Sequence, residues 1–420
     1  MAKINPQRVY LVDGARTPFS HHLRQNSKNT LPYSKLDLGV FTAQALLLKQ
    51  TFTASSLDDI VIASSTTDAS VNTGVADLAL QLAQRLRCQS TLIPHTFPAG
   101  ENCGIQALQY AHQQIAFEKK SLILLGGIET STPSPITLNP TLSQWIRQWQ
   151  TAKGITNKLK ILNRLHTRHF QQNSANKGLE NHYQLHQEKA EKTANYFSIS
   201  SAAMAEYVRL SQRRLNYAQR NKLLHHVIPV FYPDGSSLHR DEDLITIDPE
   251  ALKQPIVTGN PPTGIITQAS VTRSTDGVCM LLLANQAMVE RYHLAPLAIL
   301  SEPSWANHDD ALEPLLQQNN LQANDVDYWE WDEISAAEVL ALGNKPQFSS
   351  IEAFQSLNNV NVDGGSLALG NPNTANKFRC ILQLATILQR NNAATGVCHF
   401  SFTHQQSSAL LLQNTQESLR

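Results

Sequence analysis

The sequence predicts an α/β fold made of two similar halves, each with a mainly parallel sheet covered by helices. Through residues 1–135, short apolar segments alternate with segments of helical period, and this alternation is typical of a parallel sheet. The same order returns in residues 287–420. Residues 136–250 break the rhythm because they are rich in Gln, Asn, His, Lys and Arg, so we expect an inserted domain there. Residues 251–286 then complete the first half.

The centre of the first half is predicted to be a strand, a tight turn, a helix and a second strand. Pro98-Ala99-Gly100 breaks the chain after an apolar run, and apolar residues at helical spacing follow from Glu101. Such a turn exposes free N–H groups and the positive end of the helix dipole, which stabilise an anion. The next apolar run, 122–125, ends in Gly126-Gly127, which we interpret as its exit turn.

The remaining elements follow from the same patterns of apolar residues. In the first half we expect strands at 8–12, 59–63 and 278–283 and helices at 36–48 and 75–86. In the second half we expect strands at 297–300, 327–331, 395–402 and 408–412 and helices at 311–318, 335–342 and 374–388. The inserted domain should hold helices at 187–196 and 200–221, with the loop and N-cap at 198–202.

A basic amphipathic segment, 158–165, lies within the inserted domain. Its alternating Lys and Leu residues fit a helix with one solvated face. The same pattern also fits a surface for a membrane or a partner protein, and the sequence leaves both interpretations open.

The bulk composition excludes several classes of protein. The 420 residues carry 34 Lys and Arg against 34 Asp and Glu, which argues against nucleic acid as the main partner. Five scattered cysteines without a CxxC pair indicate neither a disulfide framework nor a zinc site, and favour a reducing, cytoplasmic location. We expect no signal peptide, because the first residues lack an apolar core, and no transmembrane segment.

Five segments, in their order along the chain, resemble motifs of the thiolase family, the 3-ketoacyl-CoA thiolases or acetyl-CoA acyltransferases. They are Ala15-Arg16-Thr17-Pro18-Phe19, Gly104-Ile105-Gln106-Ala107, Gly126-Gly127-Ile128-Glu129-Thr130, Thr275-Asp276-Gly277 and the stretch from Asn361 to Pro372. The basic segment of the inserted domain is most similar to the branch of the trifunctional β-subunit.

The resemblance implies a thiolase-like fold, with duplicated βαβαβαββ halves forming five layers, αβαβα, and an inserted loop domain. It implies coenzyme A or acyl-CoA as a ligand, with no metal and no other cofactor. It also implies a homodimer whose interface includes residues 93–97, and a β-oxidation subunit as a candidate partner.

The residues that carry thiolase chemistry are replaced in this chain. Thiolysis uses a cysteine thiolate that attacks the substrate's keto carbon, a histidine base and a second cysteine that moves a proton. The resemblance places these three roles at Glu101, Asn371 and Ser401. A carboxylate is a poor nucleophile toward a ketone, asparagine cannot act as a base, and serine needs a partner to do so. His399 and His404 are candidates for that partner, or else strand-end histidines with no catalytic role.

Asp332 and Cys103 are two further candidates. Asp332 takes the place of a neutral donor that positions a catalytic water in the family, next to a retained Glu333. A carboxylate there, near Glu101, should raise the pKa of at least one of the two acids, unless both are solvated. Cys103 lies about 200° around the helix from position 101, so we interpret it as a buried small hydrophobe.

Three functional hypotheses follow. In the first, the chain is a degenerate thiolase homologue that keeps the fold, with acyl-CoA binding as its remaining function and a structural, regulatory or ligand-binding role. In the second, it is a decarboxylase or hydrolase of acyl-CoA thioesters that uses Glu101. In the third, it is an acyltransferase with Cys103 as a displaced nucleophile. The first predicts Glu101 next to solvent, whereas a working site predicts it in a closed pocket near Asp332 and Asn371.

Overall fold

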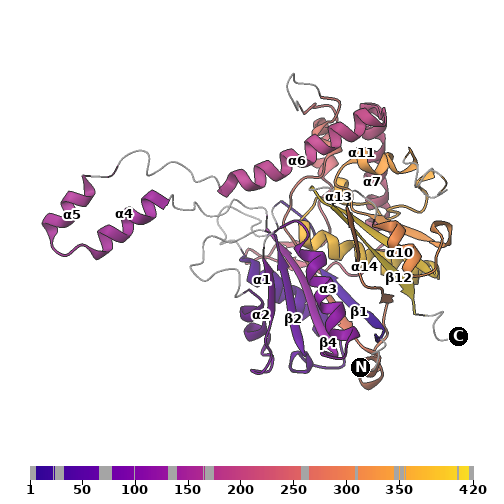
Figure 1. Ribbon diagram of the computed structural model, residues 1–420, viewed down its shortest axis with the longest axis horizontal. Coiled ribbons are helices and arrows are strands. Elements are labelled where there is room, and N and C mark those ends of the chain that lie inside the picture. Colours follow the sequence, from indigo (N-terminus) through magenta and orange to yellow (C-terminus); the bar gives the residue numbers. More distant parts are fainter. Residues whose placement is uncertain are drawn as a thin grey trace.

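The computed structural model describes residues 6–21, 23, 33–65, 78–98, 100–130, 140–163, 165, 175–256, 264–307, 311–344, 350, 354, 356–403 and 406–415. Within these residues, ten strands form one sheet, and β5 (Val230–Phe231) and β6 (Ser237–Leu238) form a separate two-stranded sheet. Figure 1 shows two blocks of sheet and helix with a long helical insertion on one side.

The ten strands divide into two halves with the same plan. The first half contains β1 (Val9–Arg16), β2 (Asp59–Ser64), β3 (His95–Pro98), β4 (Leu122–Glu129) and β7 (Gly277–Ala284), and the second contains β8 (Ala298–Leu300), β9 (Ser304–Asn307), β10 (Tyr328–Trp331), β11 (Thr395–Ser401) and β12 (Gln406–Asn414). The order β3-β2-β4-β7-β1 in one half corresponds to β10-β11-β12-β8 in the other. Among the described residues of the second half, the position equivalent to β3 shows a single bridge between Trp329 and Val360 and no strand. The duplication is therefore confirmed, and β1 and β8 join the halves through an antiparallel pair.

The sheet is mixed, which corrects the expectation of a mainly parallel one. Only the pairs β2–β3, β2–β4 and β10–β11 are parallel among the described strands, whereas β1, β7, β8, β9 and β12 make antiparallel pairs. β12 follows β11 after a short connection, which allows only an antiparallel pair, because parallel neighbours need a long crossover connection. β7 follows β4 only after the inserted domain, and it pairs antiparallel with both β4 and β1.

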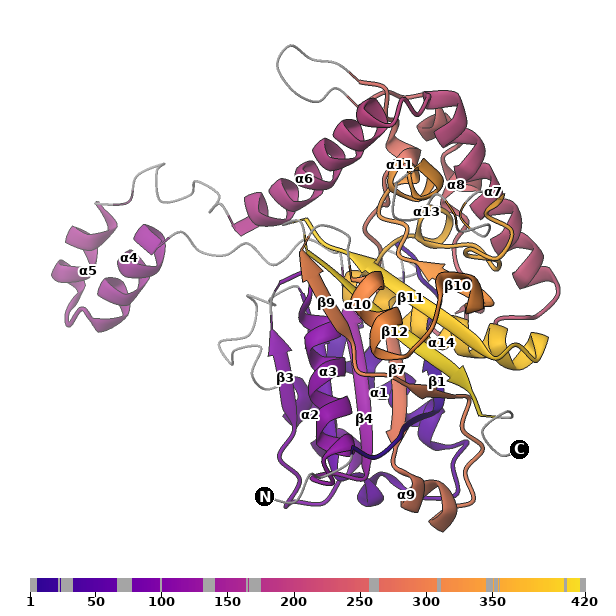
Figure 2. The same ribbon diagram turned by 45° about the vertical axis from the view of Figure 1, so that its right-hand side comes forward.

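Helices cover the outer faces of the sheet and fill the space between its halves. α1 (Lys35–Leu47) and α2 (Leu78–Leu86) pack on the outside of the first half, and α10 (Leu312–Gln318) packs on β12 and β9 in the second. α3 (Cys103–Ala116) and α14 (Asn373–Asn391) contact each other, and α14 contacts strands of both halves. Figure 2 shows α3 and α14 in this central position. The arrangement gives the five layers αβαβα.

The glycine pair of β4 allows the central helix to approach closely. Gly126 and Gly127 lie inside β4 rather than in an exit turn, which corrects our prediction. A Cβ on Gly127 would lie 2.8 Å from backbone atoms of Thr374 and Ala375 in the first turn of α14. A side chain there would push the helix away from the strand, so the pair places the N-terminus of α14 over the end of β4.

The described residues of the inserted domain form four long or medium helices and several short elements. The helices are α4 (Pro140–Thr151), α5 (Ile155–Leu162), α6 (Ala175–Tyr196) and α7 (Ser201–Arg220). Ser200 caps α7 by accepting from the Ala203 N–H at 3.1 Å, as predicted. The shorter elements here and elsewhere are α8 (Leu244–Ile247), α9 (Gln286–Arg291), α11 (Ala336–Leu340), α13 (Ser366–Leu369) and 3₁₀ turns at Ala54–Ser56, Pro249–Leu252, Gln268–Ser270, Ala323–Asp325 and Leu342–Asn344.

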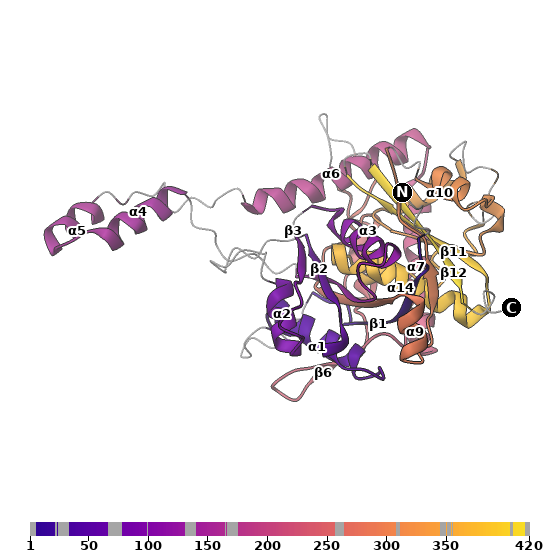
Figure 3. The same cartoon turned by 60° about the horizontal axis from the view of Figure 1, so that its bottom comes forward.

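The helices of the inserted domain differ in how they meet the core. α6 and α7 pack on α11 in the second half, whereas α4 and α5 stand clear of the sheets in all three views (Figures 1 to 3). α6 begins at Ala175, well before the predicted segment 187–196. The prediction missed these first turns because their sequence is polar and carries no apolar period. None of the helices in the described part of the chain is long and apolar enough to cross a bilayer.

Candidate functional site

Three of the four predicted site residues come from elements that meet at the same end of the two half-sheets. Glu101 lies in the turn that leads into α3, Asp332 directly follows β10, and Ser401 is the last residue of β11. The fourth, Asn371, precedes α14 by two residues. Its backbone N–H donates to the carbonyl of Arg273 at 2.8 Å, and its side-chain oxygen is buried with no hydrogen-bond partner among the described residues.

Glu101 is held by two segments that are distant in the sequence. Its Oε2 accepts hydrogen bonds from the backbone N–H and the hydroxyl of Thr403, at 2.7 and 2.9 Å. Its Oε1 lies 3.1 Å from Nε2 of His186 on α6, and both side chains are only 7% exposed. The prediction of a carboxylate next to solvent is therefore wrong: the insertion brings a histidine over the position and closes it.

α6 is anchored to the core through charged side chains besides His186. Lys189 Nζ lies 2.6 Å from a carboxylate oxygen of Glu338 on α11. Glu191, which is buried, accepts hydrogen bonds from the backbone N–H groups of Ile265 and Ile266 at 3.2 Å. Glu101 is thus one of several points that hold this helix on the body of the protein.

Asp332 is fully buried and contacts two residues of the first turns of α14. Its Oδ1 accepts from the Asn376 amide at 2.8 Å, and its Oδ2 lies 3.5 Å from Nζ of Lys377. Neither Lys377 nor Asp332 has an exposed side chain. The Lys377 amine also donates to Oδ1 of Asn373 at 2.7 Å and lies 5.5 Å from the ring centroid of Phe402. A cation is therefore buried beside Asp332 in the first turns of the central helix.

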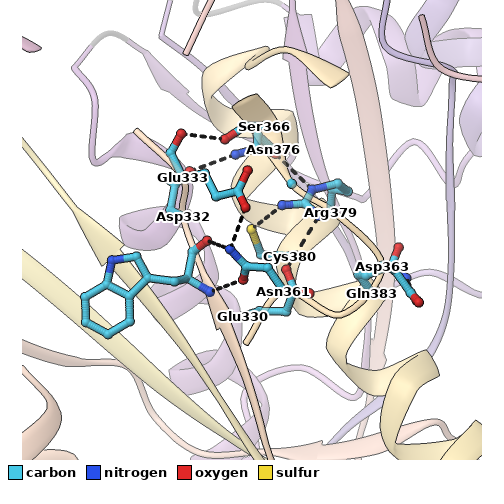
Figure 4. Close-up of polar contacts among 12 residues, drawn as sticks. Glu330, Asp332, Glu333, Asn361, Asp363, Ser366, Asn376, Arg379, Cys380 and Gln383 are labelled. Atoms are coloured by element: carbon cyan, nitrogen blue, oxygen red, sulfur yellow. Dashed lines mark hydrogen bonds and ion pairs between the residues drawn. The ribbon is translucent and has the colours of Figure 1, made fainter. Parts of the chain in front are cut away.

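The buried polar contacts continue from Asp332 to β10 (Figure 4). The amide of Asn376 donates to Asp332, and its oxygen accepts from Nε of Arg379 at 2.9 Å. The same guanidinium lies 3.5 Å from Glu330 and 2.9 Å from the sulfur of Cys380. All of these side chains are buried, so the network adds charge and polarity to the centre of the core.

Burial dominates the electrostatics of the two acids on either side of Trp331. It raises the pKa of Asp332, opposed by Lys377 and Arg379, and Glu101 adds a smaller increase. The expected raised pKa is therefore confirmed for Asp332, and the alternative of two solvated acids is wrong. Burial also raises the pKa of Glu330 to about 8, although Arg379 opposes the shift.

Glu333 has a structural role. Its carboxylate accepts from the hydroxyls of Tyr207 and Ser211, from the Asn361 amide and from the backbone N–H of Leu367, at distances of 2.7 to 3.1 Å. The donors come from α7, α13 and the loop before α13. Glu333 therefore joins the inserted domain to the second half, and its lone pairs are occupied.

His399 and Ser401 lie two residues apart on β11, so their side chains are on the same face of the strand. Ser401 is buried and paired in register with Ser407. His399 is also buried, and its ring stacks on Trp331 with centroids 3.8 Å apart. His399 is therefore a buried histidine of the strand rather than an exposed one, and His404 lies outside the described residues.

Cys103 is part of the hydrophobic core. It is 1% exposed and belongs to the apolar cluster around α3 and α14. Burial, with a smaller contribution from Glu129, raises the pKa of its thiol to about 12. Its interpretation as a buried small hydrophobe is confirmed. A thiol with so high a pKa supplies almost no thiolate near neutral pH.

Sequence reasoning missed several residues that contact the predicted site, among them His186 and Lys377. His186 lies on a polar helix, far from any motif, and nothing in the sequence pattern indicates that it approaches Glu101. Lys377 lies in the central helix of the second half, and the sequence did not indicate that it would be the partner of Asp332. The signal available for Lys377 was a charged residue inside an otherwise buried helix.

The two duplicated halves, with polar residues gathered at the ends of the half-sheets, define the class of the fold as a duplicated α/β protein, and comparison with known proteins gives the family. The sequence matches "Thiolase, N-terminal domain" over residues 9–287 and "Thiolase, C-terminal domain" over residues 294–414. The chain therefore belongs to the thiolase family.

The similar proteins cover almost the whole chain. A 3-oxoadipyl-CoA/3-oxo-5,6-dehydrosuberyl-CoA thiolase of Escherichia coli is 23% identical, over 97% of this chain and 99% of its own. The bovine mitochondrial trifunctional enzyme subunit beta is also 23% identical, over 98% and 90%. Human mitochondrial 3-ketoacyl-CoA thiolase, solved in complex with CoA, superposes with a TM-score of 0.75 at 20% identity, over 97% of this chain and 98% of that one.

Proposed function

We propose that this thiolase-family protein binds acyl-CoA but does not catalyse thiolysis. The burial of Glu101 is what a working site would also show, but its carboxylate is already engaged by His186 and by two donors of Thr403. This engagement is the observation that carries the proposal. A carboxylate attacks a ketone poorly, and one held by three contacts would have to give them up first. Asn371 cannot accept a proton, and Ser401 lacks the acidity of a thiol.

Acyl-CoA binding is supported by the family and by the preserved architecture. The Escherichia coli relative is named as a thiolase of two acyl-CoA compounds, and two of the solved thiolases, the human mitochondrial enzyme and Acat5 of Ascaris suum, are in complex with coenzyme A. The inserted domain keeps its contacts with the second half through Glu333 and α6. In this proposal the protein recognises the CoA portion, and the buried network replaces the reaction centre.

A calorimetric titration tests this proposal. We expect coenzyme A and acetyl-CoA to bind with similar affinity, because Glu101 would not react with the acetyl group. We also expect Glu101→Gln to leave both affinities and their pH dependence unchanged. Absence of heat with both ligands would reject acyl-CoA binding, and a pH-dependent affinity that disappears in Glu101→Gln would show that the carboxylate takes part in ligand binding.

A second candidate function is hydrolysis or decarboxylation of an acyl-CoA thioester. The observation in its favour is the contact between Glu101 and His186, because a carboxylate beside an imidazole is an arrangement that can activate water. Release of free thiol or carbon dioxide from acetyl-CoA, acetoacetyl-CoA and malonyl-CoA measures it. Turnover that Glu101→Gln and His186→Gln both abolish would establish this function. A role for Cys103 is disfavoured by its burial and high pKa.

We also propose a homodimer that forms through β3. This strand ends the sheet on the side of the first half, so one of its edges has no partner strand among the described residues. Antiparallel pairing with the same edge of a second copy would satisfy those backbone groups and join the sheets across a two-fold axis.

A further inference from the structure

Positive charge is concentrated in one segment of the inserted domain. Between Glu129 and Glu180 the sequence contains no Asp or Glu, whereas it contains seven basic residues, Arg147, Lys153, Lys158, Lys160, Arg164, Arg168 and Lys177. The whole chain has equal numbers of basic and acidic residues, so the remainder carries an excess of seven acidic ones. A segment of this composition within a balanced protein favours contact with an anionic surface.

Part of this segment folds into a small helical pair. Trp145 of α4 donates from its indole N–H to the carbonyl of Ile161 in α5 at 2.8 Å. The rings of Trp145 and Trp149 stack with centroids 5.6 Å apart, and Nζ of Lys158 lies 5.8 Å from the ring centroid of Trp149. We call α4 and α5 together the hairpin. Figures 1 and 3 show that it stands away from the sheets and from α7.

The hairpin exposes an apolar stripe. Ile155, Leu159 and Leu162 are 79%, 57% and 46% exposed, and α5 has no buried residue. Their spacing places them on one face of α5, with Lys158 beside them. A surface helix normally turns such a stripe toward the protein core, whereas this one faces solvent. The stripe therefore lacks a covering partner among the described residues.

We propose that the hairpin docks on the surface of a membrane that contains anionic lipids. Its apolar stripe would enter the boundary between headgroups and acyl chains, with the tryptophans at the headgroup level and the lysines near the lipid phosphates. The apolar stripe favours a membrane over nucleic acid, whose phosphate backbone needs only the charges. α4 and α5, of 12 and 8 residues, are too short to span a bilayer, so the hairpin lies on the membrane. This inference is independent of the proposed function.

Vesicle binding by the full chain tests the charge contribution. We expect cosedimentation with vesicles of phosphatidylcholine and phosphatidylglycerol, weakened by high salt, and little with phosphatidylcholine alone. Lys153→Gln/Lys158→Gln/Lys160→Gln should weaken partitioning on the order of 100-fold, since each basic side chain near an anionic surface contributes roughly a factor of five. The matched control Lys49→Gln/Lys119→Gln/Lys222→Gln changes the net charge equally at exposed positions of the body and should bind like the wild type.

Two further variants test the apolar contribution. Ile155→Gln/Leu159→Gln should lose vesicle binding, whereas Leu48→Gln/Leu80→Gln, which removes exposed leucines elsewhere, should keep it. Brominated lipids should quench tryptophan fluorescence in the wild type but not in Trp145→Phe/Trp149→Phe. Circular dichroism and thermal unfolding verify that each variant is folded.

Three outcomes would overturn the proposal. The first is the absence of binding to anionic vesicles at low salt. The second is equal loss of binding in the lysine variant and in its matched control, which would indicate a nonspecific effect of net charge. The third is tighter binding to a DNA duplex than to vesicles, unaffected by Ile155→Gln/Leu159→Gln, which would assign the hairpin to nucleic acid.

Discussion

The buried pair formed by Lys377 and Asp332 gives a prediction that the structure makes quantitative. Replacement of Lys377 by methionine keeps the length of the side chain and removes its charge. Both side chains are 0% exposed, so the carboxylate of Asp332 would lose its nearest cation at 3.5 Å without access to water. Removal of one member of a buried pair costs about 3–5 kcal/mol. We expect a loss of free energy of unfolding in this range at about pH 8.

The cost should depend on pH, with a sign set by the pKa of Asp332. Burial raises this pKa in the folded protein, and Lys377 is one of the groups that lower it. A carboxyl group with a raised folded pKa contributes stability that is fully present below its unfolded pKa and is lost as the pH rises through the folded pKa. Without the Lys377 cation, the pKa of Asp332 rises further, so the carboxyl group is protonated and uncharged over more of the acidic range. Lys377→Met should therefore reduce the free energy of unfolding less at about pH 5 than at about pH 8.

Urea unfolding at the two pH values measures the effect. Asp332→Asn should recover about 2 kcal/mol of the loss when combined with Lys377→Met at about pH 8, because it removes the uncompensated charge. Lys253→Met is the control: its amine pairs with Glu250 at 3.2 Å on the surface, and its removal should have no measurable effect. A loss below about 1 kcal/mol at both pH values, or no recovery in the double variant, would refute the reasoning.

The remaining predictions concern the network, the dimer and the chemistry. Glu101→Ala should cost about 3–5 kcal/mol, because Thr403 and His186 lose their partner, while Glu101→Gln should cost about 1–2 kcal/mol because it still accepts from Thr403; unequal urea midpoints would support this and equal ones would contradict it. The pKa of Glu330 in the folded protein, about 8, lies above its unfolded value. The free energy of unfolding of the wild type should therefore fall between about pH 5 and pH 8 relative to that of Glu330→Gln. Parallel pH profiles of the two unfolding free energies would contradict this. Light scattering at micromolar concentration should give a dimer, and a monomer would reject the pairing of β3. Glu101→Cys should not restore thiolysis, because Asn371 still cannot accept the proton.

The periodicity of the sequence predicted most of the fold. The alternation of apolar and helical segments was sufficient to place the strands and helices and to show that the two halves repeat. It could not give the direction of β7 and β12, because period-2 alternation is the same in parallel and antiparallel strands. Nor could it reveal that Gly126-Gly127 belongs to β4, since a glycine pair after an apolar run fits an exit turn equally well.

The site was predicted less completely, and the reason is distance along the chain. Motif spacing located Glu101 and Asp332. The raised pKa of Asp332 was also predicted. The contacts that define them come from His186, Lys377 and Thr403, which lie in three different segments. Only the packing of α6 on the core and of α14 on β4 brings those side chains together. Solvation of Glu101 was predicted wrongly because the covering helix is part of the insertion.

Thiolysis of acetoacetyl-CoA by the purified protein tests the central claim most directly. The protein is incubated with acetoacetyl-CoA and coenzyme A, and the acetyl-CoA formed is quantified against a reaction without protein. Because the nucleophile, the base and the second cysteine are replaced at Glu101, Asn371 and Ser401, we expect no acetyl-CoA above the reaction without protein. Turnover near one per second, abolished by Cys103→Ala, would contradict the claim and would make Cys103 the nucleophile.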